Sequence, residues 1–302
     1  MEVGYVVELV QFTDPVCTWC WGSEPLLRQV EKKLGGQVRS SFVMGGLVRD
    51  IRDFSDGANG IGGTPEAANE QIARHWEEAS ARHGMPVDTK DLHLFTNEHV
   101  STYPQNVAYK AAQMEDEALA NLFLRRIREA SSAEGRRTNA IEVLIELASE
   151  VGLDVGKFLE RMENGAGRAA FEKDQQLCAR LGIRGFPTFV VKHGERSVML
   201  RGFQQYDTIR RVMQQLAGGA LVQRAVDASD ESILDFVESH EALAPAEIRA
   251  AFDLTPDQTA AAIARLESRG SIARKKAGNG FFVRSTAVPA CSAAAGVCHA
   301  SV

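Results

Sequence analysis

The chain has 302 residues, of which 44% are hydrophobic and 25% charged, so it can build a packed core without disulfide staples. Its net charge of −6 gives no electrostatic reason to expect nucleic acid as a partner. No basic segment precedes an apolar run at the N-terminus, and no stretch approaches the roughly 18 apolar residues of a membrane span. We therefore expect a cytoplasmic protein with no membrane partner, in a compartment where thiols stay reduced.

The first 44 residues predict a β-α-β unit. Residues 5–12, YVVELVQF, are β-branched and aromatic, which is typical of a buried strand. Residues 23–36 place leucines and a valine at helical spacing before two glycines, and residues 38–44 return to strand character. Such a unit normally contains two parallel strands joined by a right-handed crossover.

A glycine-rich segment at residues 55–68 leads into a helical block. It follows a polar stretch and lacks the Lys-Ser/Thr pair of a phosphate-binding loop, so we interpret it as a mobile surface loop. From Thr64 to about Gly182 the pattern predicts helices almost throughout. Residues 186–202 then predict two short strands, and residues 206–219 a closing helix.

The sequence changes character after residue 230. Residues 231–285 predict three short helices and a two-stranded ribbon that turns at residues 278–280, an order that resembles a winged helix-turn-helix module. When such a module binds DNA, its third helix enters the major groove and basic side chains contact phosphates. The third helix would expose only one basic side chain, Arg265, beside the acidic Asp257. The wing carries Arg274, Lys275 and Lys276. A protein-contact or dimerisation module is therefore favoured over nucleic-acid binding.

Cys17 and Cys20 lie between the first predicted strand and the first predicted helix. A closed zinc site would need two more ligands, and Cys291, Cys298 and His299 are more than 270 positions away, so zinc is the less favoured alternative. At a helix N-terminus, unsatisfied N–H groups favour an anion and lower a thiol pKa below its free value of about 8.5. We therefore predict that Cys17 is an exposed nucleophile with a lowered pKa and that Cys20 resolves the mixed disulfide.

The segment DPVCTWCW at residues 14–21, followed far downstream by GIRGFPTFVV at residues 182–191, resembles the thioredoxin-like proteins of the DsbA type. FVMGGL at residues 42–47 resembles their FrnE-like cytoplasmic branch, which includes the YjbH-type protease adaptors. The resemblance implies that Pro187 is a cis proline beside the active site and that the backbone of Phe186 pairs with an extended substrate. Four aromatic side chains would line the substrate groove, namely Trp19, Trp21, Trp76 and Phe186.

We expect an α/β protein with a thioredoxin-like fold, a large all-helical insertion and a small winged-helix-like C-terminal module. The expected divisions are residues 1–63 and 183–222 for the two halves of the thioredoxin-like fold, 64–182 for the insertion, 229–286 for the module and 287–302 for a flexible tail. Cys178 is interpreted as an inert buried thiol. The tail thiols Cys291 and Cys298 are either an auxiliary redox pair, a soft-metal site with His299, or ordinary exposed cysteines.

The sequence therefore predicts a protein-disulfide oxidoreductase that acts on protein or small-thiol disulfides through Cys17 and Cys20. The pair carries the electrons itself, so no cofactor or metal is expected. The main alternative is a non-enzymatic adaptor or redox sensor that presents a partner protein to a protease or regulator. A glutathione-dependent isomerase of the same superfamily is a further alternative, but such sites usually have serine at the first cysteine position. The insertion and the C-terminal module both offer surfaces for a homodimer.

Overall fold

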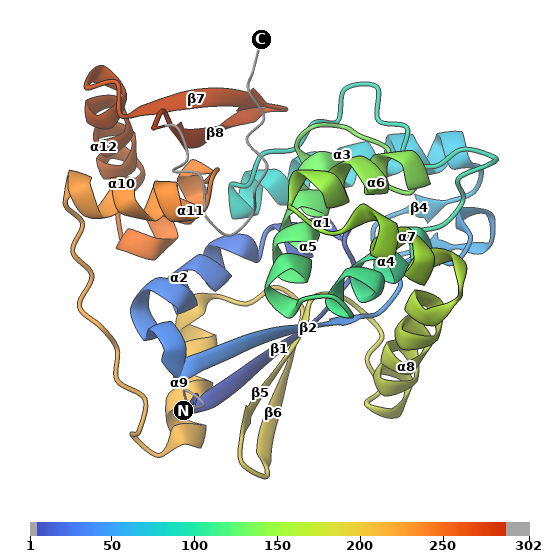
Figure 1. Ribbon diagram of the computed structural model, residues 1–302, viewed down its shortest axis with the longest axis horizontal. Helices are drawn as coiled ribbons and strands as arrows, with labels where there is room; N and C mark the ends of the chain where they lie inside the picture. Colours follow the sequence, from blue (N-terminus) through green and yellow to red (C-terminus); the bar gives the residue numbers. More distant parts are fainter. Residues whose placement is uncertain (1–4, 288–302) are drawn as a thin grey trace.

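A computed structural model describes residues 5–287 and centres on a four-stranded sheet in the order β2-β1-β5-β6 (Figure 1). The strands are β1 (Val7–Thr13), β2 (Val38–Met44), β5 (Thr188–His193) and β6 (Arg196–Arg201). β2 runs parallel to β1, whereas β5 is antiparallel to both β1 and β6. The predicted parallel pair in the first 44 residues and the predicted pair of short strands after Phe186 are therefore confirmed.

Helices cover both faces of this sheet. α2 (Glu24–Leu34) and α9 (Tyr206–Ala217) pack on one face, where Leu9 and Phe189 belong to their shared apolar core. α8 (Ala166–Arg180) packs on the other face through a core that includes Phe12 and Cys178. Successive side chains of a strand point to opposite faces, so the nearly continuous apolar run of β1 supplies both cores.

The chain between β2 and β5 forms the insertion, which departs from the predicted pattern in two places. Its elements are β3 (Ser55–Asp56), β4 (Ile61–Gly62), α3 (Pro65–His83), α4 (Tyr103–Gln113), α5 (Glu117–Ser132), α6 (Ile141–Glu150), α7 (Val155–Glu163) and α8. The glycine-rich segment is a short β3-β4 hairpin, because Ile61 is buried in a core with Ile72 of α3. Within the described residues, no helix combines the length and apolarity needed to cross a membrane.

Residues 84–102 contain no helix, so the prediction of helices almost throughout the insertion is wrong there. The backbone of this segment forms hydrogen bonds with groups distant in the sequence instead of the i to i−4 hydrogen bonds of a helix. Phe95 N donates to the side-chain oxygen of Asn69 at 3.0 Å, and the Asn69 amide donates to Phe95 O at 2.8 Å. Such side-chain partners satisfy buried backbone groups as a helix would, so an extended segment can cross the core.

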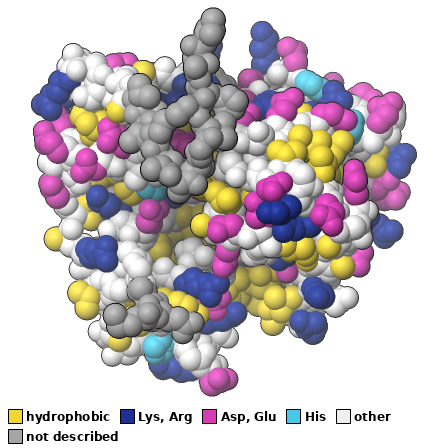
Figure 2. All heavy atoms as spheres, in the orientation of Figure 1, with side chains coloured by type: hydrophobic (Ala, Val, Ile, Leu, Met, Phe, Trp, Pro, Cys, Tyr) yellow, Lys and Arg dark blue, Asp and Glu magenta, His cyan; other side chains and the backbone are white. Residues whose placement is uncertain are grey.

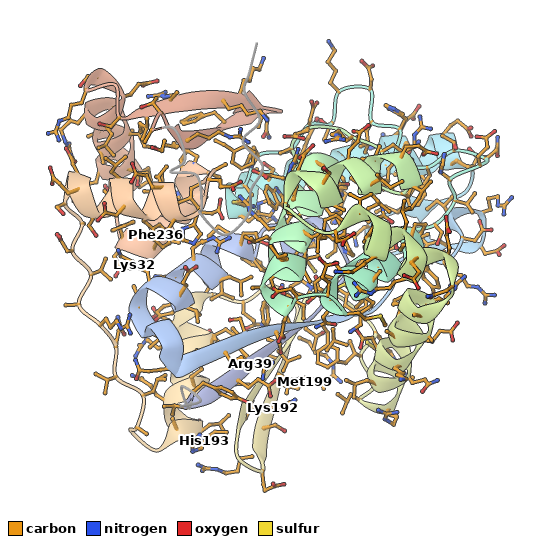
Figure 3. The ribbon with its side chains drawn as sticks, in the orientation of Figure 1. Lys32, Arg39, Lys192, His193, Met199 and Phe236 are labelled. Atoms are coloured by element: carbon orange, nitrogen blue, oxygen red, sulfur yellow. The ribbon has the colours of Figure 1, made fainter. Side chains whose placement is uncertain are left out.

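The C-terminal elements follow the predicted order of three helices and a ribbon. They are α10 (Asp230–Ser239), α11 (Pro245–Phe252), α12 (Pro256–Ser268), β7 (Ile272–Ala277) and β8 (Gly280–Ser285). We call residues 229–286 the C-terminal module. Figure 1 shows the module beside α2, on the opposite side of the molecule from α8. At this junction Lys32 of α2 lies 5.3 Å from the ring centre of Phe236 and 4.5 Å from that of Phe252 (Figure 3).

The tip of the β7-β8 ribbon is docked on the insertion. Asn279 N donates to Val87 O at 2.9 Å, and the Asn279 side-chain oxygen accepts from Val87 N at 2.9 Å. Lys275 pairs with Glu134 at 3.0 Å. The tip of the predicted wing is therefore docked on the protein itself, whereas Arg274, Lys275 and Lys276 on its strand remain exposed. Figure 2 also shows acidic and basic side chains interspersed over this face of the molecule.

Replacing Gly278 by alanine is expected to lower the free energy of unfolding by about 2–4 kcal/mol. A Cβ at Gly278 would lie 2.0 Å from Val87 O, and the residue has a φ of +48°, so both the docked tip and the backbone would have to shift. Gly270→Ala is the matched control, because Gly270 also has a positive φ but no atom within 4 Å of its Cβ position. The control is expected to cost about 1 kcal/mol in urea denaturation, and equal losses would contradict the docking.

Candidate redox site

Cys17 lies where the first helical turn meets the Phe186–Pro187 segment, which is far away in the sequence. It is the N-cap of α1 (Thr18–Trp21), a single turn that precedes α2, and its Sγ accepts a hydrogen bond from Cys20 N at 3.4 Å. Cys17 Sγ also lies 3.5 Å from Phe186 O. The Phe186–Pro187 peptide bond is cis, as the resemblance implied. Cys17 and Cys20 are both free thiols in this structure.

The burial of Cys17 differs from the prediction. Its exposed fraction is only 5%, so the expectation of an exposed nucleophile is wrong. Burial, the hydrogen bond with Cys20 and the charge of Asp14 raise the pKa of the Cys17 thiol well above its ordinary value, opposite to the predicted direction. The four-residue helix α1 directs one backbone N–H at the Cys17 sulfur. The stabilisation from this single hydrogen bond does not offset the cost of removing water from around a thiolate.

Cys20 is fully buried and carries the more acidic thiol. Burial acts to raise its pKa, but the hydrogen bond from Cys17 and the charge of Arg128 outweigh burial, so the pKa of Cys20 lies below its ordinary value. The Thr13 side chain also hydrogen-bonds Cys20. Arg128 Nη2 donates to Thr13 Oγ1 at 2.6 Å. The charge of Arg128 therefore favours the thiolate form of Cys20.

Arg128 comes from α5 of the insertion, and the sequence analysis missed it. Its side chain is 1% exposed, and Nη1 lies 2.5 Å from Glu24 Oε1. Burial opposes ionisation of Glu24, but three arginines (Arg128, Arg125 and Arg28) keep the pKa of this carboxyl below its usual range. A signal was present in the sequence: Arg128 lies four residues after the buried Leu124, on the apolar stripe of α5. A charge at such a position requires a buried partner.

Asp14 anchors the loop before Cys17 to the insertion. Its carboxylate accepts hydrogen bonds at 2.7–3.0 Å from four donors: Val16 N, Leu47 N, Thr102 Oγ1 and Asn106 Nδ2. Burial nevertheless raises the pKa of Asp14. The charge of Asp14 disfavours the Cys17 thiolate, whereas the charge of Glu24 is compensated by arginines.

A cavity of about 600 Å³ opens beside Cys17. Trp19, Trp76 and Phe186 line it, so three of the four aromatic groove residues expected from the resemblance lie around this space. Cys20 is not among its lining residues. A Cβ at Gly45 would come within 1.9 Å of the Phe186 ring, so a glycine is required for this ring to lie where it does. A molecule in the cavity can therefore meet the sulfur of Cys17 but not that of Cys20.

Trp21 lies elsewhere, and the prediction that it binds substrate is wrong. It is fully buried, and its Nε1 donates to Pro86 O at 2.9 Å. Its ring packs edge-on against Phe282 of β8 and lies 4.4 Å from the Arg125 guanidinium. Residues two apart point to opposite sides of a helical turn, so only Trp19 of this pair can face the cavity.

Cys178 is buried, as predicted, although it also lines the cavity. Burial raises the pKa of its thiol to about 11, which makes it a poor nucleophile at neutral pH. Among residues 5–287, no three His, Cys, Asp or Glu side chains are grouped so that they could hold a metal ion. Cys291 and Cys298 lie outside the described residues, so their predicted auxiliary redox role remains a prediction.

Lowering the pH from 6.5 to 4 is expected to remove about 3 kcal/mol of stability through His83. The ring packs 6.0 Å from that of Trp19, and burial lowers the pKa of His83 to about 4. The unfolded chain binds a proton near pH 6.5 whereas the folded protein resists it until about pH 4, so falling pH favours unfolding. Urea denaturation of the parent and of His83→Gln should differ in this pH window, and parallel pH profiles would contradict the assignment.

This chain is similar to known proteins over most of its length. The family described as Thioredoxin matches residues 10–211. The ClpXP adapter protein SpxH of Halalkalibacterium halodurans is 25% identical over 83% of this chain and 80% of its own length. The cytosolic disulfide reductase DsbM of Pseudomonas aeruginosa is 28% identical, with a TM-score of 0.52 over 70% of this chain and 95% of that chain. A probable DsbA oxidoreductase of Streptomyces coelicolor is 19% identical, with a TM-score of 0.54 over 74% and 94%. The thioredoxin-like fold with a helical insertion that the sequence predicted is therefore confirmed. The chain belongs to the thioredoxin family, with DsbA-like structural neighbours and SpxH adapter relatives.

Proposed function

We propose that this protein is a cytoplasmic thiol-disulfide oxidoreductase in which Cys17 exchanges disulfides with a protein or small-thiol substrate. The observation that carries the proposal is the position of Cys17, which faces the cavity on one side and hydrogen-bonds Cys20 on the other. Phe186, beside the cis proline, offers backbone groups to an extended substrate at the same place. The 28% identity to a protein named as a cytosolic disulfide reductase supports this assignment.

The charge distribution suggests how the reduced pair attacks. The Cys20 thiolate, beside Arg128, accepts the Cys17 proton through their hydrogen bond, which leaves Cys17 as the thiolate. Cys17 then attacks one sulfur of the substrate disulfide, and the other substrate sulfur leaves as a thiolate. That thiolate takes the proton from Cys20, which attacks Cys17 and releases the second substrate sulfur. The products are the Cys17–Cys20 disulfide and two substrate thiols, one of them as thiolate, and the reverse sequence oxidises a dithiol.

A second candidate function is that of an adaptor that presents a partner protein to a protease. It is favoured by curated relatives named ClpXP adapter protein SpxH, one of which aligns with 83% of this chain. In that case the cysteine pair would serve as a sensor whose oxidation changes the cavity wall. The insertion or the C-terminal module would then supply the partner surface.

Reduction of insulin disulfides by the full-length protein, with dithiothreitol as the electron source, separates the two functions. The oxidoreductase proposal predicts a rate well above that of dithiothreitol alone. Oxidation of a reduced, unfolded ribonuclease by the disulfide form tests the opposite direction. If both assays give background rates while the Cys17–Cys20 disulfide still forms, the oxidoreductase proposal fails and the adaptor is the better assignment.

A further inference from the structure

The docking of the C-terminal module brings a buried carboxylate into the charge network of the redox pair. We propose that Glu247 of α11 is a positioning residue that sets the electrostatic balance at Cys17 and Cys20 through arginines of α2 and α5. The module would thus be a working part of the redox site. This inference rests on the proposed redox function, and it assigns to the module a role beyond packing or partner contact.

Glu247 is entirely buried and holds one arginine from each of two other elements. Its Oε1 lies 3.3 Å from Arg28 Nε of α2, and its Oε2 lies 2.9 Å from Arg125 Nη2 of α5. Oε2 also accepts a hydrogen bond from Ala244 N at 2.8 Å. A buried carboxylate requires such compensation, because an ion without partners is strongly disfavoured away from water.

Two short chains of contacts connect Glu247 and its two arginines to the cysteines. In the first, Arg28 lies 3.6 Å from Glu24 Oε2, and the other oxygen of Glu24 holds Arg128 at 2.5 Å. Arg128 is the cation whose charge acts on Cys20. In the second, the Arg125 guanidinium lies 4.4 Å from the ring of Trp21, the residue directly after Cys20.

The docked module supplies one of the two buried carboxylates that face three buried arginines. Arg28, Arg125 and Arg128 are each 17% exposed or less, and the carboxylates of Glu24 and Glu247 lie between them. Glu129 contacts Arg125 at 3.9 Å, but burial raises its pKa, so it is a weaker source of negative charge. Arg28 also pairs with Glu31 at 3.0 Å, but Glu31 is half exposed. Without Glu247, one buried negative charge beside these guanidinium groups would be lost, and positive charge near Cys20 would increase.

Glu247→Gln removes one negative charge with little change of volume. The excess positive charge stabilises the thiolate form, and stabilising the reduced form makes a disulfide more oxidising. We expect the equilibrium constant against glutathione to shift about three- to tenfold toward the reduced protein, where tenfold corresponds to about 30 mV. The alkylation-rate profile of the pair should move to lower pH in parallel.

Arg28→Gln provides the opposite change within the same contact. Loss of this cation should shift both readouts in the other direction, and the double variant Glu247→Gln/Arg28→Gln should return close to the parent values. Glu267→Gln is the matched control, because it removes the same charge from an exposed position of α12 that pairs only with Arg274. A loss of packing alone would not shift the equilibrium constant against glutathione in opposite directions in the two single variants.

The proposal is overturned if Glu247→Gln and Glu267→Gln shift the equilibrium constant equally, or if the double variant departs further than either single variant. If Glu247→Gln does not fold, Arg28→Gln still tests the proposal. An unchanged equilibrium constant in Arg28→Gln would also contradict the network. Both readouts are properties of the cysteine pair and need no turnover. They therefore remain measurable even if the insulin and ribonuclease assays show that the protein is not a catalyst.

Discussion

Replacing Cys17 by serine is expected to abolish disulfide exchange and to lower turnover at least about a thousandfold. Of the cysteines that the structure describes, Cys17 alone both lines the cavity and hydrogen-bonds Cys20, and a serine hydroxyl cannot form the mixed disulfide on which electron transfer depends. Cys20→Ser should behave differently, since Cys17 can still attack but nothing resolves the product. That variant is expected to accumulate a mixed disulfide with the substrate, visible as a mass increase that dithiothreitol reverses.

Cys178→Ser is the matched control for this prediction. Cys178 lines the same cavity, but its pKa of about 11 keeps it protonated at neutral pH, so its removal should leave turnover within about twofold of the parent. Full activity in Cys17→Ser combined with loss of activity in Cys178→Ser would show that the nucleophile is Cys178 of α8. In that case the chemistry assigned to the first helical turn would be wrong.

Arg128→Met is expected to have the largest effect on stability, lowering the free energy of unfolding by about 3–5 kcal/mol. The substitution keeps the buried volume but leaves the Glu24 carboxylate without its closest cation. It also removes the charge that lowers the pKa of Cys20, so the pKa of that thiol should rise and the pair should become more reducing. Urea denaturation, alkylation rate against pH and equilibration with glutathione measure these three effects.

Arg126→Met serves as the control on the same helix. Arg126 is 16% exposed and pairs with Glu134 and with the more exposed Glu150, whereas Arg128 and Glu24 are both almost fully buried, so removing Arg126 is expected to cost less stability. Its removal should leave the equilibrium with glutathione unchanged. A similar loss of stability in both variants would show that α5 tolerates no substitution of this kind, and an unchanged Cys20 pKa in Arg128→Met would remove Arg128 from the redox site.

The structure relates the oxidoreductase and adaptor functions to each other. Cys17 forms part of the cavity wall together with Trp19 and Phe186, so its oxidation state changes the surface that a partner or a substrate meets. In both proposals the charge of Arg128, which lowers the pKa of Cys20, would favour the reduced form of the pair. The reduction potential of the pair is therefore the property that matters whichever function the assays support.

The sequence by itself determined the features that depend on neighbouring residues. The apolar run of β1 and the parallel β2 follow from β-branched composition and from the crossover rule, and Cys17 caps a helical turn because a strand ends directly before it. The motif around Pro187 led to the cis peptide bond through resemblance to a family. These features require little information about residues distant in the chain.

Only the tertiary structure decided which groups surround the two sulfurs. Arg128 reaches Cys20 from a helix more than a hundred residues away, and Glu247 reaches the same network from the C-terminal module. The sequence analysis placed Trp19 and Trp21 in one groove, but the chain forms a helical turn there, which puts Trp19 at the cavity and Trp21 against Phe282. A thiol pKa depends on the burial and charge around the sulfur, and both are set by long-range packing; the helix terminus alone therefore gave the wrong direction for Cys17.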